Sequence, residues 1–225
     1  MARTFLVGDV HGCHEELARL VESVGLAPED HLVLAGDLVA RGPDSGKVVA
    51  YARAHRARSV RGNHEARLLQ WRRGEDVSLG QAHRIAAKQL SDEDWAYLEA
   101  APVTLDLPEH GIRVVHAGMD PRVAWALQDE NVLVTIRQVK GAEDADEAVP
   151  WGTLYVGPPH VVFGHDARAG LQLHAWCTGL DTGCVYGGML TGMLLEAGQH
   201  VPADPTERST LLHSVPAARR YFAVK

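Results

Sequence analysis

The sequence is short of cysteine, of long apolar runs and of positive charge. Its 225 residues include three cysteines, Cys13, Cys177 and Cys184, without Cys-x-x-Cys spacing, which argues against a disulfide framework and against a zinc knuckle. No apolar run approaches the ~20 residues that a membrane-spanning helix needs. Residues 1–4 lead into a predicted strand without the apolar core of a signal peptide. We therefore expect a cytoplasmic protein with no membrane association.

The formal net charge is −7, from 29 acidic and 22 basic residues. This surplus of negative charge opposes stable binding of nucleic acid through a broad basic face, although a few arginines can still hold a phosphate group in a cleft. The hydrophobic content of 46% and the charged content of 23% are typical of a globular chain with a sizeable core. We expect a single domain over residues 1–225 and a monomer.

Five short apolar segments each end at a glycine that adjoins an aspartate, a histidine or an asparagine. The residues that follow these segments are Gly8-Asp9-Val10-His11-Gly12, Gly36-Asp37, Gly62-Asn63-His64-Glu65, His116-Ala117-Gly118 and Gly164-His165-Asp166. Helical periodicity follows the first two segments, over residues 14–24 and 46–54. This alternation predicts an α/β fold with a largely parallel sheet, whose strands end at one common edge. We expect the polar side chains to meet at that edge.

Other parts of the chain carry simpler patterns. Residues 65–101 are helical, with a capping box at Ser91-x-x-Asp94, and form either a small cap over the cleft or a structural helical hairpin. Residues 103–107 and 112–115 predict a β-hairpin with its turn at 108–111. The acidic run 143–147 lacks EF-hand spacing and predicts a surface loop.

Six side chains at the predicted strand ends form a candidate metal site. They are Asp9, His11, Asp37, Asn63, His116 and His165. Oxygen and imidazole ligands without thiolates suit manganese, iron or zinc. Two divalent ions that share a bridging carboxylate lower the pKa of a shared water and neutralise the charge that develops during in-line attack on phosphorus. The residue set therefore predicts a dinuclear phosphoesterase site.

Two further residues complete the predicted chemistry. Arg41, four residues after the proposed bridge Asp37, can contact two oxygens of a bound phosphate; a surface ion pair is the alternative. His64, beside the ligand Asn63, is in position to protonate the leaving oxygen as a general acid. The expected catalytic residues are thus Asp37, Arg41 and His64, and Asn63 is expected to contact the substrate as well.

Together these motifs resemble the phosphoprotein-phosphatase (PPP) superfamily of calcineurin-like metallophosphoesterases, in the family's order over residues 4–195. The resemblance implies an αββα sandwich of two mixed β-sheets flanked by helices. It also implies two divalent ions, with manganese expected and iron, zinc, cobalt or nickel as alternatives. Its ligand assignment gives Asp9, His11 and His165 to one ion, Asn63 and His116 to the other, and Asp37 to both.

One departure from the family pattern bears on the substrate. Ala40 stands where the protein phosphatases of eukaryotes and of phage lambda have an aspartate that orients the catalytic histidine. The segment 36–43 is similar instead to the bacterial symmetrical diadenosine tetraphosphatases. A nucleoside diphosphate leaves more easily than a serine alkoxide and so depends less on a well-supported acid. We therefore expect hydrolysis of diadenosine tetraphosphate to two ADP molecules.

Two other functions stay open. The compact length and the sequence Arg-Gly-Asn-His-Glu at 61–65 also fit a protein phosphatase that acts on phosphoserine, phosphothreonine or phosphotyrosine. A metal-binding scaffold without catalysis is the third possibility. Arg137 lies where compact bacterial and phage members place a second phosphate-binding arginine, with a plain surface arginine as the alternative. The expected partner is accordingly a nucleotide polyphosphate or a phosphoprotein.

Overall fold

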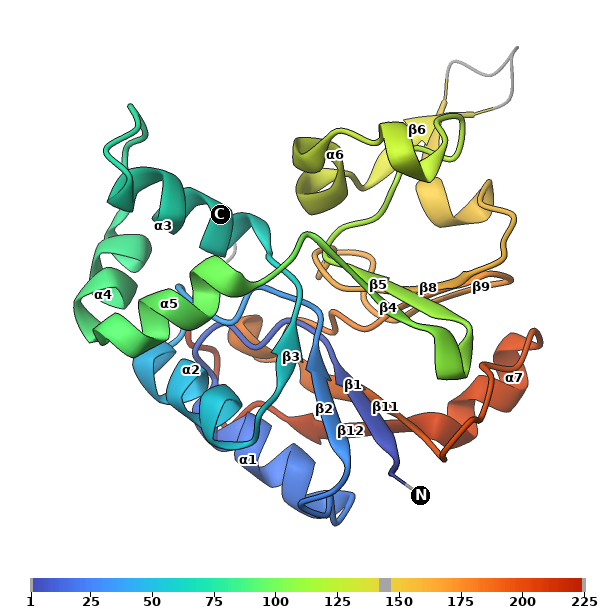
Figure 1. The fold of residues 1–225 in the computed structure, drawn as a ribbon, viewed down its shortest axis with the longest axis horizontal. Coiled ribbons are helices and arrows are strands. Elements are labelled where there is room, and N and C mark those ends of the chain that lie inside the picture. Colours follow the sequence, from blue (N-terminus) through green and yellow to red (C-terminus); the bar gives the residue numbers. More distant parts are fainter. Residues whose placement is uncertain (1, 142–146, 224–225) are drawn as a thin grey trace.

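The computed structural model describes residues 2–141 and 147–223 and contains two mixed five-stranded sheets (Figure 1). The predicted acidic loop, apart from Glu147, lies outside the described residues. The first sheet has the order β12-β11-β1-β2-β3. Its strands are β1 (Thr4–Val7), β2 (His31–Leu34), β3 (Arg58–Ser59), β11 (Met189–Leu195) and β12 (Leu212–Pro216). Strands β1, β2 and β3 run parallel, whereas β11 is antiparallel to β1 and to β12.

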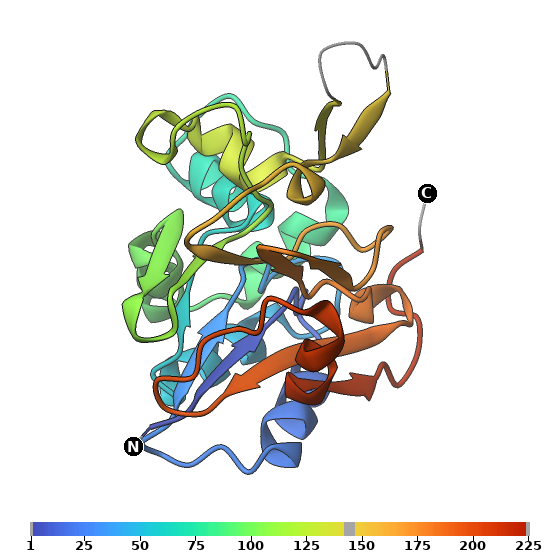
Figure 2. The same ribbon diagram turned by 90° about the vertical axis from the view of Figure 1, so that its right-hand side faces the viewer.

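The second sheet has the order β4-β5-β8-β10-β9. Its strands are β4 (Thr104–Leu107), β5 (Ile112–Val115), β8 (His160–Phe163), β9 (Gln172–His174) and β10 (Cys177–Gly179). Strands β5, β8 and β10 run parallel, and β4 and β9 flank them as antiparallel edges. A separate hairpin of β6 (Gln138–Lys140) and β7 (Ala148–Pro150) projects from the end of the molecule beyond this sheet (Figure 2).

Helices cover the outer face of the first sheet more fully than that of the second (Figure 1). The α-helices are α1 (His14–Ser23), α2 (Ser45–Ala54), α3 (Asn63–Arg72), α4 (Gln81–Gln89), α5 (Asp92–Ala100), α6 (Glu130–Thr135) and α7 (Pro205–Arg208). Short 3-10 helices lie at Pro108–His110, Trp125–Leu127, Trp151–Thr153, Cys184–Tyr186 and Ser209–Leu211. Within the described residues, none of the helices has the length and apolar character to cross a membrane.

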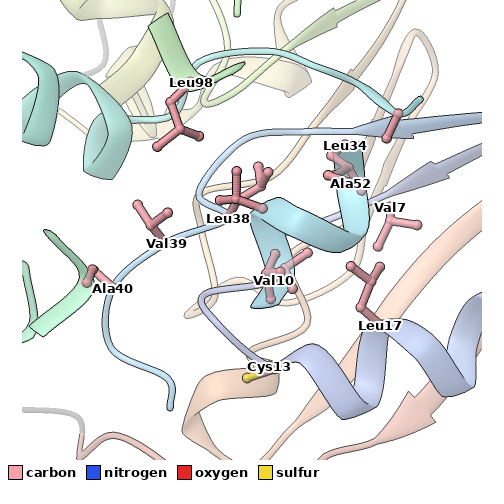
Figure 3. Close-up of a cluster of buried hydrophobic side chains, with 14 of the residues drawn as sticks. Val7, Val10, Cys13, Leu17, Leu34, Leu38, Val39, Ala40, Ala52 and Leu98 are labelled. Atoms are coloured by element: carbon pink, nitrogen blue, oxygen red, sulfur yellow. The ribbon is translucent and has the colours of Figure 1, made fainter. Parts of the chain in front are cut away.

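The alternating side chains of the strands divide the core into three layers. Phe5 and Val7 of β1 belong to the core cluster that includes residues of α1 and α2, part of which Figure 3 shows with Val7, Leu17 and Ala52 labelled. Leu6, between them in sequence, faces the second sheet instead. Because successive side chains of a strand point to opposite faces, a strand buried on both sides must be apolar throughout. This explains the short, continuous apolar runs of the sequence.

The predicted αββα sandwich of mixed sheets is confirmed, and the layer outside the second sheet is made of the short α6, the β6–β7 hairpin and 3-10 turns around Trp151. The predicted hairpin is β4–β5, with the left-handed Gly111 in its turn. The capping box forms at α5, where Ser91 accepts from the Asp94 backbone and Asp94 accepts from the Ser91 backbone. In the predicted helical segment 65–101, α4 and α5 pack on α2, whereas α3 borders the cleft. Its function as a cap stays a prediction.

Candidate metal centre

The predicted ligands all leave the carboxyl ends of strands. Asp9 and His11 follow β1, Asp37 follows β2, Asn63 begins α3 after β3, His116 follows β5 and His165 follows β8. The strands within each sheet that carry them are parallel, so their ends share an edge. The two sheets bring these edges together, and His11, Asp37, His116 and His165 meet in one buried group. Asp9 is buried beside them, and the half-buried Asn63 has its Oδ1 3.1 Å from Nε2 of His116.

Left-handed backbone conformations concentrate at this edge. Six non-glycine residues of the described chain have a positive φ, and five of them lie here. Their φ angles are 47° at His11, 47° at Asp37, 67° at Ala40, 68° at Arg41 and 70° at His165. Each such conformation costs on the order of 1–3 kcal/mol and persists only where its surroundings impose it. The concentration of strain therefore supports a functional site at this edge.

Asp37 lies at the centre of the group. Its Oδ2 atom is 3.4 Å from Nε2 of His116, 3.5 Å from Nε2 of His11 and 3.9 Å from Nε2 of His64. Asp37 belongs to two triads whose ligand atoms lie within 4.8 Å of one another, one with His11 and His64 and one with His116 and His165. This shared membership is what a carboxylate between two ions requires.

Backbone carbonyl groups orient the three histidine ligands. Nδ1 of His116 donates to the Ala35 carbonyl (2.8 Å) and Nδ1 of His11 to the Val39 carbonyl (3.1 Å), which turns both Nε2 atoms toward Asp37, where each can bind an ion when it carries no proton. His165 has the opposite arrangement, since its Nε2 lies 3.1 Å from the Thr135 carbonyl and its Nδ1 remains free to bind an ion. Metal-binding histidines usually donate their second N–H in this way.

The distances fit metal ligation better than direct hydrogen bonding. Two donor atoms about 2.1 Å from a shared ion are roughly 3.0–3.4 Å apart at octahedral or tetrahedral angles. The separations of Asp37 Oδ2 from the nitrogens of His116 and His11, 3.4 and 3.5 Å, lie at the upper limit of this range and just beyond it. They are long for charged hydrogen bonds, which are usually 2.7–2.9 Å.

The buried charges also call for cations. Four carboxylates, those of Asp9, Asp37, Glu65 and Asp181, are 5% exposed or less. No lysine or arginine within the described ranges forms an ion pair with any of them, and the ion pairs of Asp9 and Asp37 are all with histidines. Buried carboxylates are costly without cationic partners, and a histidine is a cation only when it binds a proton in place of an ion, as His116 does when Asp37 and Asp9 raise its pKa to about 10 against its burial. Divalent ions would supply the missing positive charge, so the donor set fits a metal centre.

The pKa values follow from this burial. Desolvation lowers the pKa of His11 to about 4 and that of His165 to about 3, so both rings are neutral at pH 7, the form that binds metal. Burial and the nearby Asp181 raise the pKa of Asp9 well above its usual value. Burial opposes ionisation of Asp37, but the charges of His116 and His64 hold its pKa well below the usual range.

Glu65 holds the loop that carries Asp37. The buried carboxylate accepts hydrogen bonds from the backbone N–H groups of Asp37 (2.8 Å), Leu38 (2.9 Å), Val39 (3.2 Å) and Gly62 (2.9 Å). A Cβ atom at Gly62 would overlap the Asp37 carboxylate, so only glycine allows this close approach. The Arg-Gly-Asn-His-Glu motif thus positions the candidate bridging residue as well as presenting Asn63 and His64.

The ring of His64 packs against another imidazole, and its Nδ1 atom is not bonded to a carboxylate of the described chain. Its Nδ1 is buried and has no hydrogen-bond partner among the described residues. The ring of His83, from α4, stacks on the ring of His64 with centroids 4.7 Å apart and an interplanar angle of 9°. Ala40, at the position of the phosphatase aspartate, offers only a methyl group. On the Nδ1 side, the geometry therefore supports the His64 ring by stacking rather than by a carboxylate.

The cleft over the centre has two lobes that meet at Arg41. The first lobe, about 600 Å³, is lined by α3, α4 and α6 and includes Arg61, Asn63, His64, Arg67, Arg73 and His83. The second lobe, about 580 Å³, includes Arg137, His165, Asp166, Arg168, Tyr186 and Phe222. The Arg41 guanidinium is 2.9 Å from Nε2 of His11 and lines both lobes. Arg41 is therefore well placed to bind a phosphate over the centre.

The predicted site residues thus converge, with one change in grouping. The imidazole of His165 lies with His116 (centroids 5.0 Å apart) and Asp37, whereas the contact of His165 with Asp9 is made by its backbone N–H (3.0 Å). The structure therefore favours His165 as a ligand of the His116 ion rather than of the Asp9–His11 ion. Arg137 is exposed, 3.6 Å from the Asp166 carboxylate, at the rim of the second lobe.

Several residues of the site carry weak sequence signals. Asp181 follows the buried strand β10 and repeats the pattern of a carboxylate near a glycine, so the rule that finds Asp37 could have found it. Glu65 stands inside a recognised motif. His83, Tyr186 and Phe222 have no local pattern that separates them from ordinary surface or core residues, and only the fold brings them to the cleft.

Comparisons with known proteins give a consistent picture. A family model described as calcineurin-like phosphoesterase matches residues 2–169. The symmetrical bis(5'-nucleosyl)-tetraphosphatase of Glaesserella parasuis is 29% identical, over 88% of this chain and 96% of its own length. The asymmetrical bis(5'-nucleosyl)-tetraphosphatase of Bacillus velezensis is 28% identical, over 83% of this chain and 86% of its own. A crystal structure of a candidate diadenosine tetraphosphatase is 34% identical with a TM-score of 0.81, covering 96% of this chain and 94% of that one.

Proposed function

The chain belongs to the calcineurin-like phosphoesterase family of metal-dependent hydrolases, and we propose that it hydrolyses dinucleoside tetraphosphates symmetrically, diadenosine tetraphosphate yielding two ADP molecules. The observation that carries the proposal is the two-lobed cleft. Lobes of about 600 and 580 Å³ lie on either side of the candidate metal centre. Lobes of nearly equal volume suit a substrate that is divided into two equal halves.

The charge of the cleft supports a polyphosphate chain. Arg61, Arg67 and Arg73 line the first lobe, and Arg137 and Arg168 line the second. Guanidinium groups bind phosphate oxygens in bidentate fashion. Arg73 and Arg137 form ion pairs with Glu75 and Asp166, whereas Arg61, Arg67 and Arg168 have no ion pair within the described residues and so offer positive charge to the phosphates.

The reaction assigns a role to each residue at the centre. Asp9, His11, Asp37, Asn63, His116 and His165 would hold two divalent ions, for which manganese is the expected metal. Bound there, the ions supply an acidified water as nucleophile and neutralise charge on the phosphoryl oxygens. Arg41 holds oxygens of the attacked phosphate, with Asn63 beside it. Attack by the water oxygen forms one P–O bond and breaks another, and His64 donates a proton or a hydrogen bond to the leaving phosphate oxygen.

The support of His64 favours a phosphoanhydride over a phosphoserine. A carboxylate bound to Nδ1 would raise the pKa of the ring and keep it protonated near neutral pH, ready to donate its proton, but Nδ1 of His64 has no such partner among the described residues. An alkoxide leaving group needs a proton from a general acid, whereas a nucleoside diphosphate leaves with little assistance. The stack with His83 fixes the direction of the ring without adding charge.

A second candidate is asymmetrical hydrolysis to AMP and ATP. It is favoured by the Bacillus velezensis relative, which carries that activity in its name and matches the chain over most of its length. The difference lies in which phosphate Arg41 presents to the nucleophile. The products, and not the rate, distinguish the two candidates.

The test is a comparison of kcat/KM for diadenosine tetraphosphate, p-nitrophenyl phosphate and a phosphoserine peptide with the manganese-loaded protein. We expect the dinucleotide to be preferred. A phosphopeptide as the best substrate would overturn the proposal and indicate a protein phosphatase. His64→Ala should abolish most of the turnover, and His55→Ala, an exposed histidine at the end of α2, is the matched control.

A further inference from the structure

The second lobe contains two aromatic side chains that the proposed chemistry does not use. Tyr186, from the 3-10 turn after Gly183, and Phe222, near the end of the chain, line it together with Arg41 and His165. Both rings are half-buried, so part of each remains accessible from the lobe that it lines.

The rings and Arg41 form one connected group. The centroids of Tyr186 and Phe222 are 6.4 Å apart with an interplanar angle of 67°. The guanidinium carbon of Arg41 is 5.5 Å from the Tyr186 centroid and 6.0 Å from the Phe222 centroid. A phosphate held by Arg41 therefore has both rings within reach of the nucleoside attached to it.

Phe222 is held in place by contacts that span the whole chain. The backbone N–H groups of Tyr221 and Phe222 both donate to the Val185 carbonyl, at 3.0 and 2.9 Å. The Tyr221 hydroxyl donates to the buried carboxylate of Glu16 on α1 (2.8 Å), and the backbone N–H of Ala218 donates to the same oxygen (2.9 Å). The segment is thus fastened to the cleft before any ligand binds, and a preformed aromatic surface costs little entropy on binding.

The shape of the lobe suits a flat ring. Gly183, Gly187 and Gly188 line it beside the aromatic pair, so no side chain projects from this part of the wall. By contrast, no phenylalanine, tyrosine or tryptophan is among the residues found to line the first lobe, which is dominated by arginines. The two lobes have nearly the same volume but different chemistry, and only the second offers an aromatic pair.

We propose that Tyr186 and Phe222 form a nucleobase subsite, in which the base of one nucleotide stacks on the aromatic pair while Arg41 holds its phosphate. The inference rests on the proposed function for the identity of the ligand, a nucleoside diphosphate moiety. Stacking of a base on an aromatic side chain contributes about 1–3 kcal/mol and tolerates any base. The subsite therefore recognises a nucleotide without selecting adenine strongly.

The test compares binding of ADP with binding of inorganic pyrophosphate to the full-length, manganese-loaded protein by calorimetry, without turnover. Phe222→Ala should weaken ADP binding about tenfold, since 1.4 kcal/mol corresponds to a factor of ten, and should leave pyrophosphate binding within twofold. Phe222→Trp and Tyr186→Phe, which keep an aromatic ring, should retain ADP binding. Trp71→Ala, which removes an exposed aromatic ring of α3 outside the second lobe, is the control for general effects.

The outcomes separate this inference from the proposed function. Equal effects of Phe222→Ala on ADP and pyrophosphate, or no effect on either, would overturn the subsite. So would wild-type protein that binds ADP no more tightly than pyrophosphate. If ADP binding depends on Phe222 but no dinucleotide is hydrolysed, the subsite stands and the proposed substrate is wrong. If ADP is released from the dinucleotide but the affinity for ADP is unchanged by Phe222→Ala, the function stands and the subsite is wrong.

Discussion

Replacement of His83 by alanine should slow turnover while leaving the metal content unchanged. His83 makes a nearly parallel stack with His64, at 4.7 Å and 9°, and the Nδ1 of His64 has no other partner in the described chain. Aromatic pairs of this kind contribute about 0.5–1.5 kcal/mol. If all of that energy holds His64 in its productive orientation, its loss lowers kcat by about two- to tenfold, because 1.36 kcal/mol corresponds to a factor of ten in rate.

The assay is steady-state turnover of diadenosine tetraphosphate with metal analysis of each variant. His83→Phe keeps a ring for stacking and should recover most of the kcat lost in His83→Ala. Lys88→Ala, an exposed change on the same helix, is the control. In a His64→Ala background, where turnover is already reduced about 10²–10⁴-fold, His83→Ala should have no further effect.

Three results would refute this reasoning. The first is an unchanged kcat in His83→Ala. The second is a His83→Phe variant as slow as the alanine variant, which would mean that a nitrogen of His83, not its ring face, matters. The third is loss of metal from His64→Ala, which would make His64 a ligand, as its place in a triad with His11 and Asp37 also permits.

Asp37→Asn should lose both the bound manganese and the activity, because Asp37 belongs to both triads; full metal content measured by mass spectrometry would contradict the bridging role. Arg208→Leu should lower the free energy of unfolding by about 3–5 kcal/mol, measured by urea denaturation, because the buried guanidinium donates to carbonyl groups of the loop before α7 and of the β9–β10 turn that would be left unpaired; a change below about 1 kcal/mol would contradict this. Burial and the charge of Arg208 lower the pKa of His160 to about 3. The folded state therefore keeps this ring neutral while the unfolded state protonates it below about pH 6.5, and His160→Asn should reduce the loss of stability between pH 6.5 and 3; equal losses in both proteins would refute it.

Much of the fold and most of the site could be predicted because the signals are local. Each candidate metal ligand follows a short apolar strand within a few positions, so the same stretch of sequence predicts both the end of a strand and a ligand. The parallel arrangement of β1, β2 and β3 then brings Asp9, Asp37 and Asn63 to one edge without further information. The sequence does not indicate which of the two ions His165 would bind. That assignment depends on which ring nitrogen is hydrogen-bonded to the Thr135 carbonyl.

The remaining site residues could not be predicted because long-range packing places them. His83 reaches His64 only through the packing of α4, and Phe222 reaches the cleft through the hydrogen bond of Tyr221 to Glu16 at the other end of the chain. Cys13 and Cys184 likewise lie far apart in sequence but join Glu16 in one buried group. Such contacts leave no periodicity or spacing in the sequence.

Chromatography of the nucleotides released from diadenosine tetraphosphate by the manganese-loaded protein at early times decides which bond is broken. We expect ADP as the sole product, with Asp37→Asn inactive under the same conditions. Equal amounts of AMP and ATP would contradict symmetrical hydrolysis, because they require cleavage of an outer anhydride bond rather than the central one. An intact dinucleotide beside a dephosphorylated phosphopeptide would contradict the proposed substrate itself.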